Sequence, residues 1–326
     1  MAKEKSDSIE VSLVAPVFNE EESVGPFYQR IVSVMERLGL SYEIVFINDG
    51  SSDGSFAKLK MLHSQDERVM IVDLSRNFGK EIALTAGIDF ARGSCVIPID
   101  VDLQDPPEVI PRLIDKWREG FDVVYASRLE REGETVLKKA TASAFYRLIA
   151  GMTRFPIPKN TGDFRLMNRR VVDALKRLRE TNRFMKGLFS WVGFNQTGIV
   201  YTRERRFAGK TKWNYNKLFN LAIEAITSFS EVPLKIASLL GLIISLFAIG
   251  YGFYLIVRTL FWGNPVPGYT SLMAVILFLG GIQLISIGII GEYVGRIYNE
   301  SKRRPLYLVR SLWGFKEYSE GCEPIR

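Results

Sequence analysis

The chain has 326 residues, a net charge of +7 and 47% hydrophobic residues, which allows one sizeable domain plus further segments. Its only histidine is His63 and its two cysteines are Cys95 and Cys322, so a His-based triad, a zinc site and a disulfide framework are all disfavoured. The positive charge is typical of a protein that contacts nucleic acid or an anionic membrane. Residues 236–257 and 259–291 carry no charge and are each long enough to span a bilayer, so we favour the membrane and expect no nucleic-acid partner.

The first part of the chain alternates short apolar runs with helical segments. This alternation predicts an α/β domain with a mainly parallel sheet, joined by right-handed crossovers. The apolar runs are continuous, as in strands whose two faces are both covered. The expected strands are 9–17, 42–47, 69–74, the run that leads into Asp100, and 122–126, and the expected helices include 21–38, 81–91 and 108–119.

Polar side chains gather directly after these strands. Ligands of open α/β sheets bind beyond the carboxyl ends of the strands, so this edge predicts a nucleotide site. It is not a dinucleotide-binding site, because no G-x-G-x-x-G follows the first strand, and residues 209–211 are not a P-loop, because Glu204 stands where the first glycine is needed. The side chains expected at this edge are Asp49, Asp53, Asn77, Lys80, Asp100 and Asp102.

A D-x-D motif lies at the end of the fourth expected strand. Residues two apart on a strand point to the same side, so Asp100 and Asp102 are expected to face one small volume. Hard divalent cations such as Mg²⁺ or Mn²⁺ take oxygen ligands and share them with substrate phosphates. The motif therefore predicts a metal–diphosphate site, although acidic residues also cap helices and occupy turns.

The second part of the chain predicts a membrane hairpin. We expect spanning helices at 232–257 and 271–294, with aromatic residues in the connecting turn. Lysines and arginines flank the pair, so the positive-inside rule places both ends of the hairpin in the cytoplasm. The polar first ten residues do not predict a signal peptide, which agrees with that topology. Residues 141–153 and 215–229 are expected to be interfacial helices.

Glycines on the second spanning helix, among them Gly291 and Gly295, permit close helix packing and favour a homo-oligomer. Two spanning helices are too few for a pore in one protomer, so the product is expected to need a separate flippase. The expected domains are residues 1–210 as a cytoplasmic catalytic domain, 211–231 as a juxtamembrane helix, 232–298 as the hairpin, and 299–326 as a cytoplasmic tail.

Four spaced motifs carry a resemblance to a known family. Residues 16–20 (PVFNE), 48–53 (NDGSSD), 100–104 (DVDLQ) and 161–166 (TGDFRL) resemble the signature of inverting glycosyltransferase family 2, in its polyisoprenyl-phosphate branch. This branch includes dolichyl-phosphate mannose synthases, and the terminal helix pair is similar to that of bacterial undecaprenyl-phosphate (bactoprenol) glucosyltransferases. The resemblance implies a GT-A fold and the inner membrane of a bacterium as the location.

The resemblance also implies roles for individual residues. Asp163 matches the catalytic base, with Asp102 and Arg165 as further catalytic residues. The metal ligands, for Mg²⁺ or Mn²⁺, would be Asp102, Asp100 and Gln104, and Arg128 and Arg165 would approach phosphate groups. The residues implied to bind the nucleotide sugar are Pro16, Phe18, Glu20, Asp49, Ser52, Lys80, Asp100, Gln104, Arg128 and Lys210.

The implied reaction moves a hexose, with glucose from UDP-glucose favoured, to the phosphate of a polyprenyl phosphate. A phosphate monoester has a second pKa near about 6, so Asp163 either takes the last proton or orients the acceptor. A further glycosyltransferase would use the lipid-linked sugar. Two alternatives stay open: another sugar (mannose, galactose, N-acetylhexosamine or aminoarabinose), and an inactive lipid-binding scaffold, against which the intact motifs argue.

Overall fold

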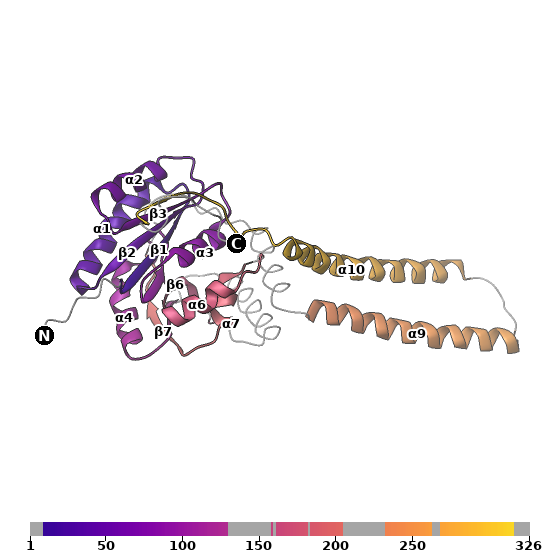
Figure 1. Ribbon diagram of the computed structural model, residues 1–326. Helices are drawn as coiled ribbons and strands as arrows, with labels where there is room; N and C mark the ends of the chain where they lie inside the picture. The colour runs from indigo at the N-terminus through magenta and orange to yellow at the C-terminus, as the bar shows by residue number, and fades with distance from the viewer. Residues whose placement is uncertain are drawn as a thin grey trace.

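The computed structural model shows a two-faced α/β domain from which a long helical hairpin projects (Figure 1). It describes residues 9–129, 158, 161–181, 183–204, 232–262 and 268–315. The expected interfacial helices at 141–153 and 215–229 lie outside these residues, so they remain predictions.

The first half of the domain is a run of parallel strands joined by helices, as the alternation predicts. Acidic residues in the first turn of α1 favour the helix through its dipole, and Gly39 ends it in the left-handed conformation with φ of 64°. The elements are β1 (Val11–Val17), α1 (Glu21–Leu38), β2 (Tyr42–Asn48), α2 (Ser55–Gln65), β3 (Val69–Leu74), α3 (Lys80–Phe90) and β4 (Cys95–Pro98).

The second half of the domain departs from the expected parallel pattern. A short 3₁₀ turn, Pro107–Val109, leads into α4 (Ile110–Arg118). The remaining elements of this half are β5 (Val123–Arg128), β6 (Thr161–Asn168), α6 (Arg169–Arg177), α7 (Met185–Trp191) and β7 (Gln196–Tyr201).

The sheet has eight strands in the order β7-β5-β6-β4-β1-β2-β3-β8 and is mixed. Strand β6 runs antiparallel to both β4 and β5, and β8 (Val309–Trp313) runs antiparallel to β3. The four other neighbouring pairs are parallel. The expected mainly parallel sheet is confirmed, with β6 and β8 as the antiparallel strands that the alternation did not indicate.

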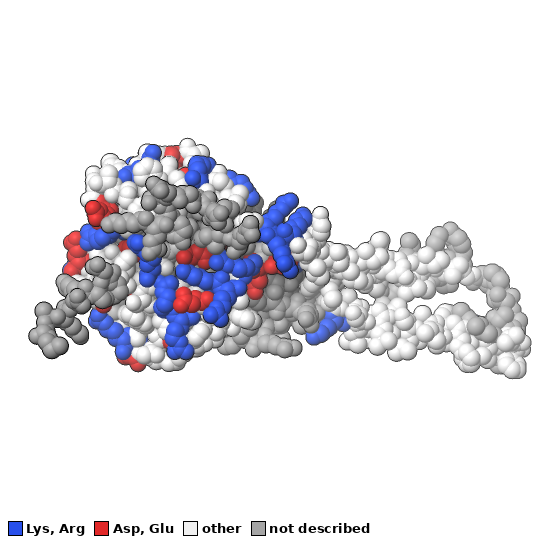
Figure 2. Space-filling view, viewed as in Figure 1, with Lys and Arg blue, Asp and Glu red and all other residues white. Residues whose placement is uncertain are grey.

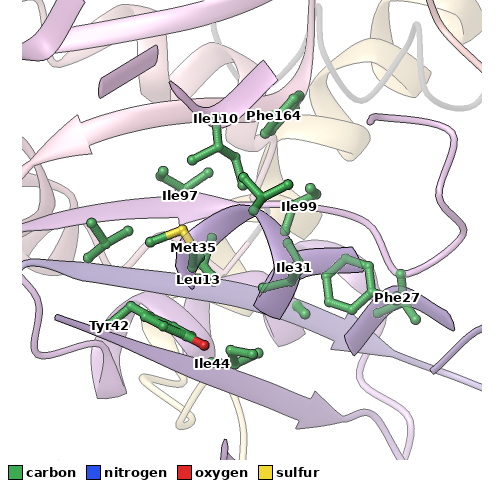
Figure 3. Close-up of a cluster of buried hydrophobic side chains, with 14 of the residues drawn as sticks. Leu13, Phe27, Ile31, Met35, Tyr42, Ile44, Ile97, Ile99, Ile110 and Phe164 are labelled. Carbon is green, nitrogen blue, oxygen red and sulfur yellow. The ribbon is translucent and has the colours of Figure 1, made fainter. Parts of the chain in front are cut away.

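Helices cover both faces of this sheet, and each strand sends alternate side chains to either side. On one face Phe27 and Ile31 of α1 pack in one cluster with Leu13 of β1 and Ile44 of β2, as Figure 3 shows. The other face packs against α3, α6 and α7. The core thus fixes the strand ends, where the polar loops meet.

The hairpin consists of α9 (Val232–Trp262) and α10 (Tyr269–Ser301), each longer than expected. Both contain windows apolar enough to cross a membrane, Ala237–Tyr254 and Phe278–Ser301, and neither window is buried in the protein. The two helices lie side by side, and the end of α10 returns to the domain (Figure 1). The hairpin associates the chain with a membrane.

The residues after α10 do not form only a tail. Strand β8 pairs with β3 at the edge of the sheet, and Tyr307 donates a hydrogen bond to Asp89 at 2.8 Å. The sheet of the α/β domain is therefore completed by residues that follow the hairpin.

Candidate functional site

The D-x-D motif lies in a turn beyond the strand. Strand β4 ends at Pro98, so Asp100 and Asp102 are not both on its extended backbone. Leu103, with φ of 58°, turns the chain, and the Gln104 backbone N–H donates to Asp102 Oδ1 at 3.0 Å. Asp102 is 6% exposed, whereas the side chain of Asp100 is 25% exposed. The expected position of both residues on the strand is wrong, because they lie in the turn that follows it.

Lys80, the first residue of α3, joins this turn to β6. Its Nζ lies 2.7 Å from Asp100 Oδ2 and 2.8 Å from Asp163 Oδ2. These three residues are far apart in the sequence, and the mixed sheet brings them together because β6 is inserted next to β4. Burial lowers the pKa of the Lys80 ammonium, but the neighbouring carboxylates of Asp100 and Asp163 raise it above its ordinary value, so Lys80 stays charged.

Asp163 is the buried member of this group. Burial alone would raise the pKa of its carboxyl, but Lys80 and Lys186 lower that pKa to about 2. Its Oδ1 is buried and has no hydrogen-bond partner among the described residues. Glu81, one residue beyond Lys80, has a pKa raised to about 7 by its burial and by the charge of Asp163. Asp163 is therefore an ionised carboxylate with one unsatisfied oxygen.

Arg165 lies behind Asp163 and is only 3% exposed. Its guanidinium carbon is 3.9 Å from the ring centroid of Phe189, and its Nη2 donates to the Gly162 carbonyl at 2.8 Å. Burial lowers its pKa to about 10. The side chain supports the backbone before Asp163, and its expected approach to a phosphate group stays a prediction.

Arg128, at the end of β5, belongs to a second cluster. Its Nη2 is 3.5 Å from Asp105 Oδ1, and its Nε donates to the Tyr201 hydroxyl at 3.2 Å. The Tyr201 hydroxyl in turn donates to Asp105, which is 2% exposed. A Cβ on Gly162 would lie 2.7 Å from Arg128 Nη2, so a larger residue at this point of β6 would require the guanidinium to move.

Asp105 is a site residue that the sequence reasoning missed. Burial raises the pKa of its carboxyl, which Arg128 opposes, and Arg203 Nε lies 3.8 Å away. A carboxylate placed between two guanidiniums holds them in position. Its position directly after Gln104, in the same D-V-D-L-Q-D run, could have indicated a role in the site. No sequence pattern pointed to Tyr201 or Lys186.

The loops after β1 and β2 form the neighbouring part of the edge. Asp49 accepts hydrogen bonds from the Phe78 and Gly79 backbone N–H groups at 2.7 and 3.0 Å, and burial raises its pKa. It therefore holds the loop that leads to Lys80. A Cβ on Gly50 would lie 2.5 Å from the Asn77 nitrogen, so these two loops touch.

The other residues expected to contact the nucleotide lie on the same loops. Pro16 is within β1, paired with Ile47, and Phe18 is 39% exposed just beyond it. The Glu20 backbone N–H donates to Ser55 Oγ at 2.9 Å, and the Ser52 backbone N–H donates to Asn19 Oδ1 at 2.8 Å. Lys210 lies outside the described residues.

The oxygen ligands present fit a hard divalent cation. Asp100, Asp102 and Gln104 offer two carboxylates and an amide within five consecutive residues. In the part of the chain that the structure describes, no three His, Cys, Asp or Glu side chains converge as a metal site. Mg²⁺ and Mn²⁺ sites with one or two carboxylates are completed by substrate phosphates and water. The side chains thus suit a cation that arrives with a diphosphate.

Comparison with known proteins agrees with this architecture. Residues 12–176 match the family model Glycosyl transferase family 2, and residues 232–297 match the model GtrB C-terminal hairpin. An uncharacterized glycosyltransferase of Synechocystis sp. is 56% identical over 309 residues, covering 95% of this chain and 97% of that protein. The bactoprenol glucosyl transferase of Shigella phage SfV is 50% identical over 303 residues, covering 93% and 99%.

Among solved structures, glucosyl-3-phosphoglycerate synthase from Mycobacterium tuberculosis, in complex with Mn²⁺, UDP-glucose and phosphoglyceric acid, aligns with a TM-score of 0.44. It is 17% identical, covering 67% of this chain and 78% of that one, a likeness too weak to bear on substrate or metal. The family model and the relatives decide the matter: the domain has the GT-A fold, and the chain is a glycosyltransferase that belongs to glycosyltransferase family 2.

Proposed function

We propose that this chain transfers glucose from UDP-glucose to a polyprenyl phosphate at the cytoplasmic face of a bacterial inner membrane. The observation that carries the proposal is the 50% identity to a bactoprenol glucosyl transferase, which covers 93% of this chain and so includes both the catalytic domain and the hairpin. The hairpin supports a lipid acceptor, because a polyprenyl chain stays in the bilayer and its phosphate must be met at the surface.

In this proposal the nucleotide lies over the loops after β1 and β2, near Phe18, Glu20 and Ser52. The diphosphate lies beside the turn after β4, where Asp100, Asp102 and Gln104 would hold Mg²⁺ or Mn²⁺. That cation, when bound, offsets the charge that develops on the departing nucleoside diphosphate. Arg128, held by Asp105, supplies a guanidinium for a phosphate group.

The transfer is a single displacement with inversion at the sugar. An oxygen of the acceptor phosphate forms a bond to the anomeric carbon as the bond from that carbon to the UDP oxygen breaks, and UDP leaves with the electron pair. Most acceptor phosphate is already dianionic at neutral pH, because its second pKa is near about 6. Asp163, whose pKa is lowered to about 2, is a weak base, so its role is to orient the acceptor through its charge. Its unpartnered Oδ1 supports this role.

The hairpin places the site near the lipid. Lys235 precedes the first uncharged stretch, and Arg296, Lys302 and Arg303 lie at the end of the second, which supports cytoplasmic ends for both helices. The lipid-linked glucose would then need a flippase and a further glycosyltransferase, neither supplied by this chain. We also propose a homo-oligomer, in which glycines of α10 allow helices to pack closely.

A donor screen tests the proposal. The full-length protein in detergent is incubated with polyprenyl phosphate, Mg²⁺ or Mn²⁺, and one radiolabelled UDP- or GDP-sugar at a time. We expect label in the organic-soluble lipid with UDP-glucose, and NMR of the product should show the anomeric configuration opposite to that of the donor.

The outcomes separate the alternatives. If label enters the lipid from another nucleotide sugar and not from UDP-glucose, the proposed donor is wrong but the proposed reaction stands. Retained configuration would contradict the single displacement. Lipid binding without transfer from any donor would leave a non-catalytic scaffold as the better description.

A further inference from the structure

The contact that links the metal-binding turn to Asp163 is a single ammonium group. Lys80 Nζ is 2.7 Å from Asp100 Oδ2 and 2.8 Å from Asp163 Oδ2, so the two carboxylates share one ammonium group. Asp100 and Asp163 belong to different parts of the proposed site, the donor side and the acceptor side. Lys80 is therefore placed to make each side respond to the other.

The position of Lys80 is fixed by the fold. It follows Gly79, whose φ is 96°, and begins α3. The Gly79 backbone N–H and that of Phe78 donate to the buried Asp49, which anchors the loop. On the other side Glu81 Oε2 accepts the Met185 backbone N–H at 2.9 Å, which ties the start of α3 to α7. The ammonium thus extends from a backbone that is held at both ends.

A divalent cation at Asp100 and Asp102 would meet this ammonium. Two like charges a few ångströms apart repel each other strongly in a partly buried site. Lys80 and the cation would share Asp100, whereas Asp163 would keep Lys80 as a partner. Lys80 contacts Asp163 through Oδ2, whereas Oδ1 is buried and has no hydrogen-bond partner among the described residues.

We propose that Lys80 is a positioning residue that competes with the divalent cation for Asp100 and holds Asp163 in its ionised, oriented form. This rests on the proposed function and adds to it a coupling between the two halves of the site. The charged groups that act on Asp163 are Lys80, Lys186, Arg165 and Glu81. Of the first three, which are the cations, Lys80 is the one that also contacts Asp100.

The test measures cation binding without turnover. Mn²⁺ is titrated into full-length protein in detergent with saturating UDP, and free Mn²⁺ is followed by electron paramagnetic resonance. We expect Lys80→Met to bind Mn²⁺ roughly tenfold more tightly than the wild type, because the competing charge is gone. Lys80→Arg should stay close to the wild type. The matched control is Lys116→Met, which removes an equal charge on α4, where Lys116 pairs with Glu119.

Turnover is measured on the same variants with the donor that the screen identifies. Lys80→Met should lose about tenfold or more in kcat while it gains Mn²⁺ affinity, and Lys80→Arg should recover part of the loss. General damage to the site would instead lower kcat and Mn²⁺ affinity together. Unchanged or weaker Mn²⁺ binding in Lys80→Met would overturn the competition, as would a lack of Mn²⁺ binding in every variant. Unchanged kcat would overturn the link to Asp163. The Mn²⁺ measurement uses neither sugar nor lipid, so its result stands even if the proposed donor or acceptor is wrong.

Discussion

The two apolar regions of this chain use the same kinds of side chain in opposite ways. In the catalytic sheet Leu13 and Phe46 are fully buried, whereas in the hairpin Phe247 is 74% exposed and Leu260 is 78% exposed. The sheet covers its apolar surface with its own helices (Figure 3). The hairpin covers almost none and depends on lipid to do so. Apolar content therefore does not by itself reveal which solvent a segment meets.

Charge divides the same two regions. Lys, Arg, Asp and Glu side chains are interspersed over the domain, whereas the visible surface of the hairpin is almost free of them (Figure 2). The ion pairs that order the candidate site, such as those of Lys80, depend on partial burial inside the domain. Substitutions in the domain should consequently change turnover or stability, whereas substitutions in the hairpin should change membrane insertion.

The largest expected effect separates chemistry from anchoring. Asp163→Asn keeps the shape of the side chain but removes its charge, so kcat should fall by about 10²–10⁴-fold. Asp102→Asn should remove the cation dependence together with most of the turnover. Turnover is measured by transfer of label to lipid, and both proteins should still float with membranes in a density gradient. A loss of donor affinity alone in Asp163→Asn would make Asp163 a binding residue and not a catalytic one.

The next effect compares one aromatic residue in each region. The ring centroids of Phe46 and Phe27 lie 5.9 Å apart in an edge contact. Phe46→Ala opens a cavity there and should lower the free energy of unfolding by about 3–5 kcal/mol. Phe247→Ala should leave the stability of the domain unchanged, because Phe247 is outside its core. Hydrogen exchange of the β2 amide groups checks both. Equal destabilisation by the two variants would mean that the regions do not differ as described.

The first half of the fold could be predicted because each strand is a local apolar run. Strands β1 to β4 are neighbours in the sheet, in the order β4-β1-β2-β3, and their polar ends are visible in the sequence. Strand β6 could not be recognised in the same way, since its position between β4 and β5 depends on pairing with distant strands. Strand β8 was missed for a stronger reason: it follows the hairpin, and its partner β3 is more than 200 residues earlier.

The candidate site shows the same limit. The positions of Asp49, Lys80 and Asp100 at one sheet edge followed from the rule for parallel strands. The ion pairs of Lys80 with Asp100 and Asp163 did not, because they depend on where the antiparallel β6 enters. The motif that contains Arg165 likewise gave no sign that its guanidinium packs against the ring of Phe189. Sequence reasoning located the edge, and packing decided which side chains meet there.

A charge placed in the hairpin should have an intermediate effect. Ile249→Arg, near the middle of α9 and within the Ala237–Tyr254 window, should cost about 2.5–3.5 kcal/mol of membrane insertion. The fraction of protein resistant to alkaline extraction measures this. Met61→Arg is the matched control, because Met61 is also an exposed apolar residue, at 52%, but lies on α2 of the domain. Full insertion of Ile249→Arg would show that this face of α9 meets water or protein.

The smallest expected effect concerns the point where the two regions are joined. Arg310, in the strand that follows the hairpin, donates to the Ser75 carbonyl at 2.6 Å and lies 3.6 Å from Asp73 Oδ2. Arg310 is more than half exposed, and Asp73 keeps its hydrogen bond from Asn48, so Arg310→Ala should lower stability by at most about 1 kcal/mol. We expect faster hydrogen exchange of β8 amide groups, with membrane flotation unchanged.

Arg37→Ala is the control for this variant, since Arg37 is another exposed arginine whose side chain bonds locally, to Ser33. If Arg310→Ala loosened the whole β3 edge and lowered kcat together with it, the strand after the hairpin would be helping to hold the loop that carries Lys80. If neither changed, pairing of the β3 and β8 backbones would suffice to join the two regions, because those hydrogen bonds do not depend on the side chain of Arg310.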